Sequence, residues 1–89
     1  MKNMKREEIL KKIREVLIDH KWVRPRKKVW EKNNFYLDFN MDSIDMIEMT
    51  LDIQKDLAIE ITDEEVEKID TVADLADIIE KKLKETHNL

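Results

Sequence analysis

The chain has 89 residues, with 17 Lys and Arg against 21 Asp and Glu, a formal net charge of −4, no Cys, no Gly and one Pro. A chain this short has room for one modest core, so we expect a single domain over residues 1–89 without an enclosed multi-residue active site. The lack of cysteine excludes disulfides and thiolate metal clusters, and no apolar run is long enough for a membrane span or a signal peptide, which favours a cytoplasmic protein.

Charge is distributed unevenly along the chain. Residues 1–34 carry 12 basic and 5 acidic side chains, whereas residues 35–89 carry 5 basic and 16 acidic ones. The acidic part would repel a phosphate backbone, and no aromatic residues alternate with the basic ones on a strand, so we expect no nucleic-acid partner. The acidic part favours protein partners with basic patches.

The first predicted element is an amphipathic helix from Met4 to His20, where apolar residues recur at steps of three and four. Residues 21–42 lose this period, because Pro25 restricts Arg24 and three asparagines supply turn-forming side chains. We therefore predict a long connection here. Its large apolar side chains are candidates for holding it against the core: Val29, Trp30, Phe35, Leu37 and Phe39.

The first part of this connection is strongly basic. Its cationic residues are Lys21, Arg24, Arg26, Lys27 and Lys28, with Trp22 and Trp30 on either side. The default interpretation is a solvated, weakly paired surface, and the alternatives are contact with the acidic part of the chain, with a partner or with a membrane surface. We expect both tryptophans to anchor the loop.

The second predicted helix covers about residues 43–57 and begins with a capping box formed by Asp42 and Asp45. It has two apolar sides. The side expected to face the core holds Met46, Ile47, Met49, Ile53 and Leu57. A second stripe consists of Ile44 and Leu51, with Asp45, Glu48 and Asp52 around it. This stripe is either the edge of the core or an apolar strip, ringed by acidic residues, on which partner proteins dock.

Two further capping motifs follow. A Thr-x-x-Glu motif at residues 62–65 opens a short helix to about Lys68, and a Thr-x-x-Asp motif at residues 71–74 opens a last amphipathic helix to about Glu85. No segment predicts a strand with a partner. The predicted fold is all-α: a four-helix bundle with a short third helix and a long loop between helices one and two.

Ser43 is the only serine in the chain, and it stands where the second predicted helix begins. Taken alone, it is best explained as an N-terminal cap or first-turn residue. Asp42 and Asp45 flank it, and no nearby His or Lys could accept its proton, so we expect no catalytic residue. An exposed hydroxyl at a helix end can, however, be modified by another enzyme.

We also expect no metal site. Asp38, Asn40 and Asp42 have the spacing of a helix-loop-helix calcium loop. The sixth position of that loop would be Ser43 instead of Gly, and the twelfth would be Met49 instead of the bidentate Glu.

The sequence from Asp42 to Asp45, followed by Glu48, and the later stretches 59–65 and 69–72 resemble the acyl carrier protein family. They are similar to that family's second helix, third helix and start of the fourth, in the same order. The resemblance covers about residues 35–85. Ile44 replaces the usual Leu of the Asp-Ser-Leu motif. Asn40 stands where Gly is usual, and the chain has no Gly to supply a positive φ.

The resemblance implies a carrier and not an enzyme. Ser43 would bear 4′-phosphopantetheine, transferred from coenzyme A by a separate phosphopantetheinyl transferase. The protein would hold acyl chains as thioesters and present them to acyl-transfer, condensing and other biosynthetic enzymes, and fatty-acid synthesis fits best. The alternatives are a carrier of polyketide or aminoacyl cargo and a non-carrier helical adaptor. We expect a monomer.

The resemblance also implies roles for the residues around Ser43. The partner-docking residues would be Asp42, Ile44, Asp45, Glu48, Leu51 and Asp52. The residues lining an acyl pocket would be Met46, Ile47, Met49, Ile53, Leu57, Ile61 and Leu75.

Overall fold

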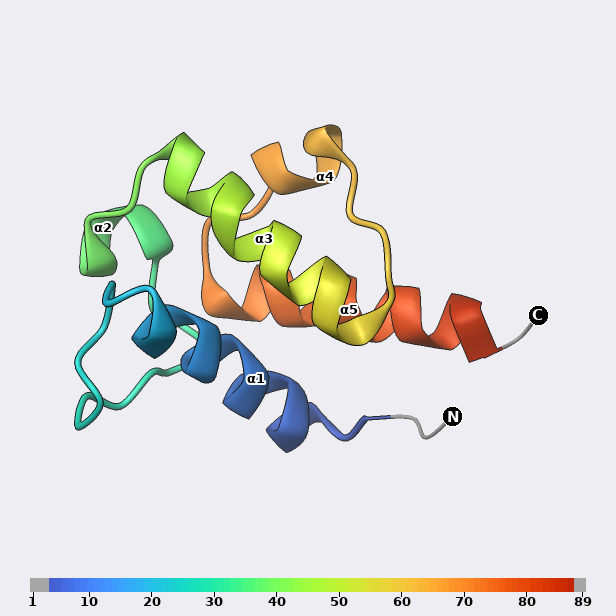
Figure 1. The fold of residues 1–89 in the computed structure, drawn as a ribbon, viewed down its shortest axis with the longest axis horizontal. Coiled ribbons are helices and arrows are strands. Elements are labelled where there is room, and N and C mark those ends of the chain that lie inside the picture. Colours follow the sequence, from blue (N-terminus) through green and yellow to red (C-terminus); the bar gives the residue numbers. More distant parts are fainter. Residues whose placement is uncertain (1–3, 88–89) are drawn as a thin grey trace.

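A computed structural model describes residues 4–87, with side chains as far as residue 85 (Figure 1). Its helices are α1 (Arg6–Asp19), α2 (Phe35–Phe39), α3 (Ser43–Leu57), α4 (Asp63–Glu67) and α5 (Val72–His87). In this part of the chain there is no strand, and one isolated antiparallel bridge joins Asn34 to Thr71. The predicted all-α class is confirmed.

The three long helices form the body of the molecule. Helix α1 runs in the opposite direction to α3 and α5 and packs against both, while α4 packs against α3 (Figure 1). Each long helix buries one apolar stripe, because residues three or four apart share a helix face. The fully buried side chains at the centre are Ile9, Ile13 and Leu17 of α1, Met46, Met49 and Ile53 of α3, and Leu75 and Ile79 of α5.

The connection between α1 and α3 contains a helix that was not predicted. The side chain of Asn34 caps α2 by accepting the amides of Tyr36 and Leu37 at 2.9 and 3.0 Å. Asn40 ends α2 with a φ of 55°, in agreement with its expected role in a chain without Gly. Five residues are too few to show a helical period, so the sequence pattern missed this helix.

Only part of the predicted apolar set holds this connection to the core. Phe35 and Phe39 are buried, and Val29 is partly buried. The prediction is wrong for Leu37 and Trp30, which are 81% and 54% exposed. Positions 35 and 39 share a face of α2, and this places Leu37 on the opposite face. Trp30 instead lies beneath the ammonium group of Lys28, which is 5.5 Å from the ring centroid.

Backbone hydrogen bonds attach the connection to the start of α5. Three of them, each 2.9 Å long, are Phe35 N–H to the carbonyl of Asp70, Val72 N–H to that of Asn33, and Ala73 N–H to that of Glu31. These bonds satisfy backbone groups that a loop alone could not pair. They fix α2 relative to the end of the bundle where α3 begins.

We predict that Phe35→Ala lowers the free energy of unfolding by about 3–5 kcal/mol, because it removes a fully buried aromatic ring. Leu37→Ala, two residues away on the exposed face, is the matched control and should change it by less than about 0.5 kcal/mol. Urea unfolding followed by circular dichroism measures both. Similar losses in the two variants would contradict the assigned faces of α2.

The predicted capping motifs are confirmed, and the one at α5 generates a pH dependence. The carboxylate of Asp74 accepts the amides of Asp70 and Thr71 at 2.9 and 3.0 Å. The hydrogen bond from the Thr71 backbone is the main reason why the pKa of Asp74 lies below its ordinary value. A lowered pKa in the folded state means that Asp74 stabilises the fold above its ordinary pKa and loses this effect as the pH falls through the folded value.

We predict that Asp74→Asn lowers the melting temperature at pH 7 and reduces the further fall in melting temperature below about pH 4. The control is Glu60→Gln, which removes the charge of an exposed carboxylate and should lower the melting temperature at pH 7 by less than Asp74→Asn does. Thermal melts from pH 7 to about pH 3 provide the comparison. If the two variants had identical pH profiles, this role of the Asp74 carboxylate would be refuted.

Candidate functional site

Ser43 is exposed and is the first residue of α3. The helix begins here because Asp42 and Asp45 form a reciprocal capping box: Asp42 Oδ1 accepts the Asp45 amide at 2.8 Å, and Asp45 Oδ2 accepts the Asp42 amide at 3.1 Å. The amides of Ser43 and Ile44, in the first turn, have no intrahelical acceptor, and the helix dipole is positive at this end. An anionic group attached to the Ser43 hydroxyl would be favoured there.

The segment in front of Ser43 is firmly held. Phe39 and Met41 are buried, and the amide of Met41 donates to the carbonyl of Phe35 at 3.1 Å. Met46, in the first turn of α3, is fully buried. The Ser43 hydroxyl therefore lies at the end of a rigid element and not on a free loop.

A pocket of about 290 Å³ lies beside Ser43, between α2, α3 and α4. Its lining residues are Tyr36, Ser43, Ile47, Asp63, Val66 and Glu67. Tyr36 is half-buried, and its burial, together with the negative charge of Asp70, raises the pKa of its hydroxyl. The pocket combines apolar walls with two carboxylates, so it could shelter an apolar group tethered to Ser43.

Of the residues expected to line an acyl pocket, Ile47 is among those that line the pocket beside Ser43. Met46, Met49, Ile53 and Leu75 are fully buried in the core, Ile61 is buried and Leu57 is half-buried. The expectation that Ile47 faces the core is wrong, since its side chain is 43% exposed. It lies about 100° around the helix from Met46, at the edge of the buried stripe.

Sequence reasoning missed most of the pocket lining. Tyr36 comes from α2, whereas Asp63, Val66 and Glu67 come from α4. The available indication that Tyr36 and Val66 could line a pocket was that one is aromatic and the other aliphatic. Nothing in the local pattern indicated that these two short helices meet at Ser43.

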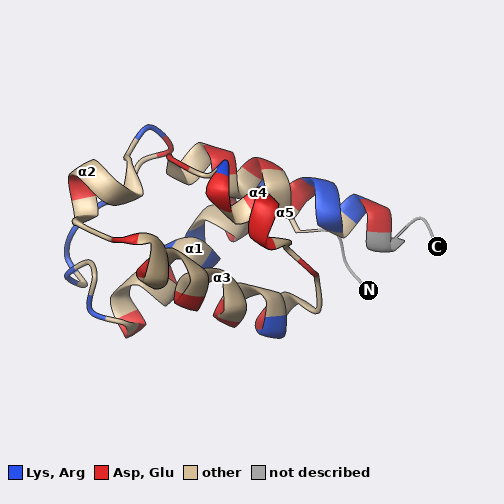
Figure 2. Cartoon of the chain, turned by 90° about the horizontal axis from the view of Figure 1, so that it is seen from above, with Lys and Arg blue, Asp and Glu red and all other residues tan. Residues whose placement is uncertain are grey.

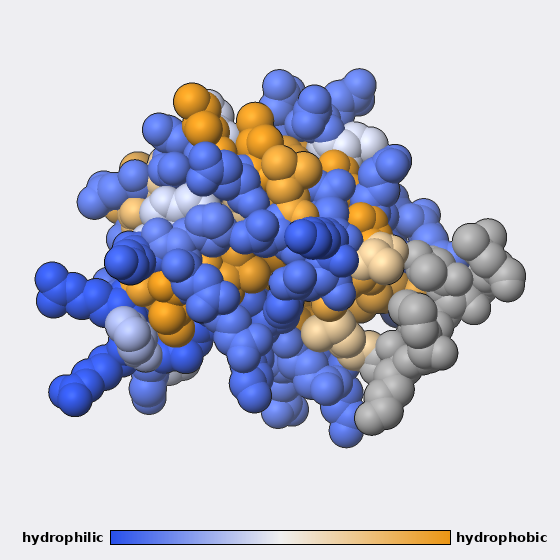
Figure 3. Space-filling model, in the orientation of Figure 1, coloured by the Kyte–Doolittle hydropathy of each residue, from blue (hydrophilic) through white to orange (hydrophobic). Residues whose placement is uncertain are grey.

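The outer side of α3 is apolar at its centre. Ile44 and Leu51 are exposed, and with Ile47 they form a stripe that starts next to Ser43. Figure 3 shows apolar surface emerging over the α3 region among hydrophilic residues. The interpretation of Ile44 and Leu51 as the edge of the core is therefore excluded.

The acidic residues of α3 fall into two groups. In its second half, Asp52 contacts Nε2 of His20, whose ring stacks on Trp22 at 4.4 Å, and Asp56 forms a 2.6 Å ion pair with Lys12. In its first half, Asp45 and Glu48 have no ion pair within the described structure. The Ser43 end of α3 therefore carries carboxylates without ion pairs. Helix α4 adds further Asp and Glu residues (Figure 2), of which Glu65 forms a 3.0 Å ion pair with Lys82.

The described residues contain neither a candidate metal site nor a candidate membrane span. No group of three or more His, Asp or Glu side chains between residues 4 and 85 could hold a metal ion. Over the same residues, none of the helices has both the length and the apolar character needed to span a bilayer.

Residues 28–79 match the family model described as a phosphopantetheine attachment site. An acyl carrier protein from Thermosynechococcus vestitus is 39% identical over 80 residues, which cover 90% of this chain and 98% of the relative. The crystal structure of an acyl carrier protein from Thermotoga maritima is 34% identical, has a TM-score of 0.83 and covers 97% of this chain and 99% of that one.

A third comparison extends the fold to a more distant protein. The solution structure of a 3-oxo-butyl acyl carrier protein from the actinorhodin polyketide synthase of Streptomyces coelicolor has a TM-score of 0.68 at 18% identity, covering 94% of this chain and 95% of that one. Together with the family match, the two closer relatives identify the cofactor as covalent 4′-phosphopantetheine and the protein as a carrier and not an enzyme. The chain belongs to the acyl carrier protein family.

Proposed function

We propose that Ser43 is the attachment point of 4′-phosphopantetheine and that the protein presents acyl groups to successive enzymes of fatty-acid synthesis. The observation that carries this proposal is the position of the only serine. Ser43 lies within the matched residues 28–79, is exposed at the start of α3 and borders the pocket between α2, α3 and α4.

The residues around Ser43 fit a phosphodiester. The first-turn amides and the helix dipole favour its negative charge and offset repulsion from the carboxylates of Asp42 and Asp45. When bound, the group supplies a thiol at the end of a flexible arm, where an acyl chain can be carried. Ile47, Val66 and Tyr36 offer apolar surface for such a chain within reach of the tether.

The exposed stripe of Ile44 and Leu51, with Asp45 and Glu48 beside it, is the proposed docking surface for the phosphopantetheinyl transferase and the later enzymes. An apolar centre with a charged rim is the usual composition of such a surface. Unpaired carboxylates would attract basic patches and orient the encounter. Asp42, close to the tether, belongs to the same surface, whereas Asp52 is engaged by His20 and contributes less.

Fatty-acid cargo is supported by the aliphatic pocket wall and by the close relatives named acyl carrier protein. The same proposal places the protein in the cytoplasm, together with coenzyme A and the enzymes that load it. Mass analysis of the acyl groups held by protein from its native host tests the cargo, and recovery of polyketide or aminoacyl groups would replace the fatty-acid assignment.

We predict that incubation with coenzyme A and a phosphopantetheinyl transferase increases the intact mass by one phosphopantetheine group, and that Ser43→Ala abolishes this increase. Thr62→Ala is the matched control, because Thr62 is also an exposed hydroxyl residue at the start of a helix. It should be loaded like the unchanged protein. Loading of Ser43→Ala, or no loading of the unchanged chain by any transferase, would refute the attachment point.

We predict that Glu48→Gln lowers kcat/KM for loading by about threefold to tenfold and weakens its dependence on ionic strength, since it removes an unpaired charge next to Ser43. Asp56→Asn should have a smaller effect, because Lys12 already neutralises Asp56. Steady-state loading rates at low and high salt measure both, and circular dichroism checks that the helices are intact. Equal effects of the two variants would show that docking does not depend on the Ser43 end of α3.

A further inference from the structure

The basic part of the connection between α1 and α2 forms a surface that the carrier role does not use. We call it the basic tip and define it by Lys21, Arg24, Arg26, Lys27, Lys28 and Trp30, all of which are exposed. Within the described structure, none of its five cationic side chains forms an ion pair. Its positive charge is therefore available to a partner.

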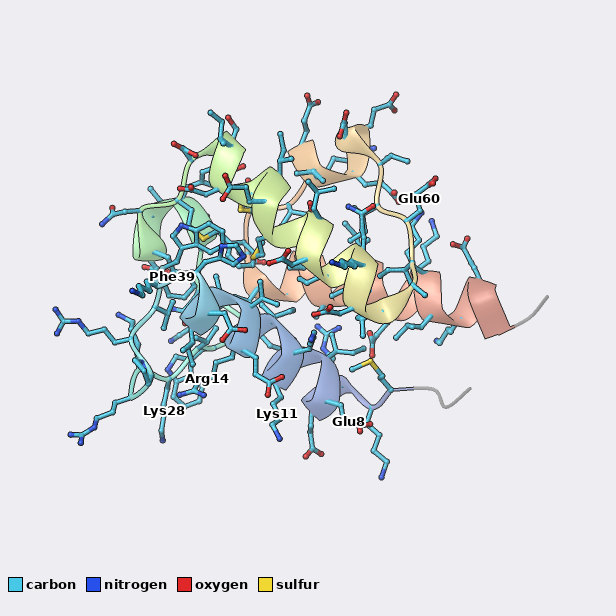
Figure 4. All side chains as sticks on the ribbon, in the orientation of Figure 1. Glu8, Lys11, Arg14, Lys28, Phe39 and Glu60 are labelled. Carbon is cyan, nitrogen blue, oxygen red and sulfur yellow. The ribbon has the colours of Figure 1, made fainter. Side chains whose placement is uncertain are left out.

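The basic tip is an ordered turn. The guanidinium group of Arg14, on α1, donates to the backbone carbonyls of Pro25 and Lys27, and the amide of Lys27 donates to the carbonyl of Arg24 at 3.0 Å. Figure 4 shows Arg14 reaching from α1 toward this segment, with Lys28 pointing away from the bundle. The backbone is thus held while the cationic side chains extend into solvent.

Nearby carboxylates reduce this charge only in part. Asp38 is close enough to Lys27 and Lys32 for their charges to contribute to the lowering of its pKa, after the larger contributions from hydrogen bonds. Glu31 is paired with Arg6. Asp38 and Asp19, which is two residues from Lys21, are exposed carboxylates without an ion pair in the described structure, and five cations against these two leave the surface positive.

An apolar surface adjoins the charges. Trp30 is 54% exposed and borders an open hollow of about 530 Å³, which Leu10 and Val29 also line. Tryptophan combines a large apolar ring with a polar N–H group and is favoured where an apolar phase meets water. Clustered cations beside such a ring are the composition that binds to anionic lipid surfaces.

We propose that the basic tip docks the protein on a membrane surface that contains anionic lipids. Five flexible cationic side chains gain attraction from a fluid array of headgroups without adopting one fixed geometry, whereas a folded protein partner would have to immobilise each of them. Nucleic acid is a poorer fit, because Lys28 covers a face of Trp30 and Trp22 is stacked on His20, so no open pair of aromatic faces remains for bases.

The fold allows the protein to contact a membrane through the basic tip while its acidic helices face away. The connection lies at the end of the bundle that also carries α2 and the start of α3 (Figure 1), and the acidic side chains gather over α3 and α4 (Figure 2). The molecule measures 37 × 27 × 21 Å, and salt screens charges beyond about 8 Å at physiological ionic strength. The acidic helices, with Ser43 at the start of α3, can therefore face away from the lipid with little repulsion.

The test is co-sedimentation of the full chain, loaded with phosphopantetheine, with vesicles of equal parts phosphatidylcholine and phosphatidylserine, and with vesicles of phosphatidylcholine alone. We expect binding to the anionic vesicles at low salt, a steep loss of binding as salt rises, and none to the neutral vesicles. The variant Arg24→Gln/Arg26→Gln/Lys27→Gln/Lys28→Gln should bind at least about a hundredfold more weakly, since each charge removed costs about fivefold.

The control is Lys11→Gln/Lys55→Gln/Lys81→Gln/Lys84→Gln, which has the same net charge but loses exposed lysines elsewhere. It should retain binding within about fivefold. Both variants should still be loaded by the transferase, which separates this test from that of the carrier role. Absence of vesicle binding at low salt, equal losses in the two variants, or binding to single-stranded RNA or poly-glutamate but not to vesicles would overturn the proposal.

Discussion

The capping box between Asp42 and Asp45 determines where α3 begins, and the proposed function depends on that point. The box satisfies amides that a helix end leaves open, and the buried stripe of Met46, Met49 and Ile53 fixes the rotation of the helix about its axis. Together they place the hydroxyl of Ser43 outside, next to free amides. The rotation that buries the methionines also exposes Ile44 and Leu51, so the proposed attachment point and the proposed docking surface both follow from the position of one helix.

Contacts from α1 make the charge of α3 uneven along the length of the helix. Lys12 forms an ion pair with Asp56 in the second half of α3, His20 contacts Asp52, and Lys55 adds a positive charge in the last turn. That end of the helix is therefore less negative than its carboxylates alone would make it. The carboxylates near Ser43 remain without ion pairs in the described structure, and α4 adds more beside the pocket. Attraction for a partner with a basic patch would therefore be strongest beside the proposed attachment point.

A chain without glycine has to form its turns by other means. Lys21, Asn40 and Ala58 adopt positive φ values, each against the steric preference of an L-residue. Backbone hydrogen bonds close the turns at Lys21 and Ala58, whose amides donate to the carbonyls of Ile18 and Gln54. The Asn34 cap, the buried rings of Phe35 and Phe39, and backbone bonds to the start of α5 hold the segment that ends at Asn40. The long connection is consequently an ordered part of the fold, and the same order presents the basic tip on one side and the wall of the pocket on the other.

The sequence by itself determined what depends on near neighbours in the chain. Capping motifs act over three residues and buried stripes repeat every three or four, so the long helices, the start of α3 and the exposed place of Ser43 could be predicted. Tertiary structure alone decided which side of α2 faces inward, that Ile47 lines a pocket with Tyr36 and Val66, and that His20 meets Asp52 across 32 positions of sequence. Such contacts join helices that are separated in the sequence, so local sequence patterns do not predict them. The way the helices pack depends on how all of their apolar faces are buried in one core.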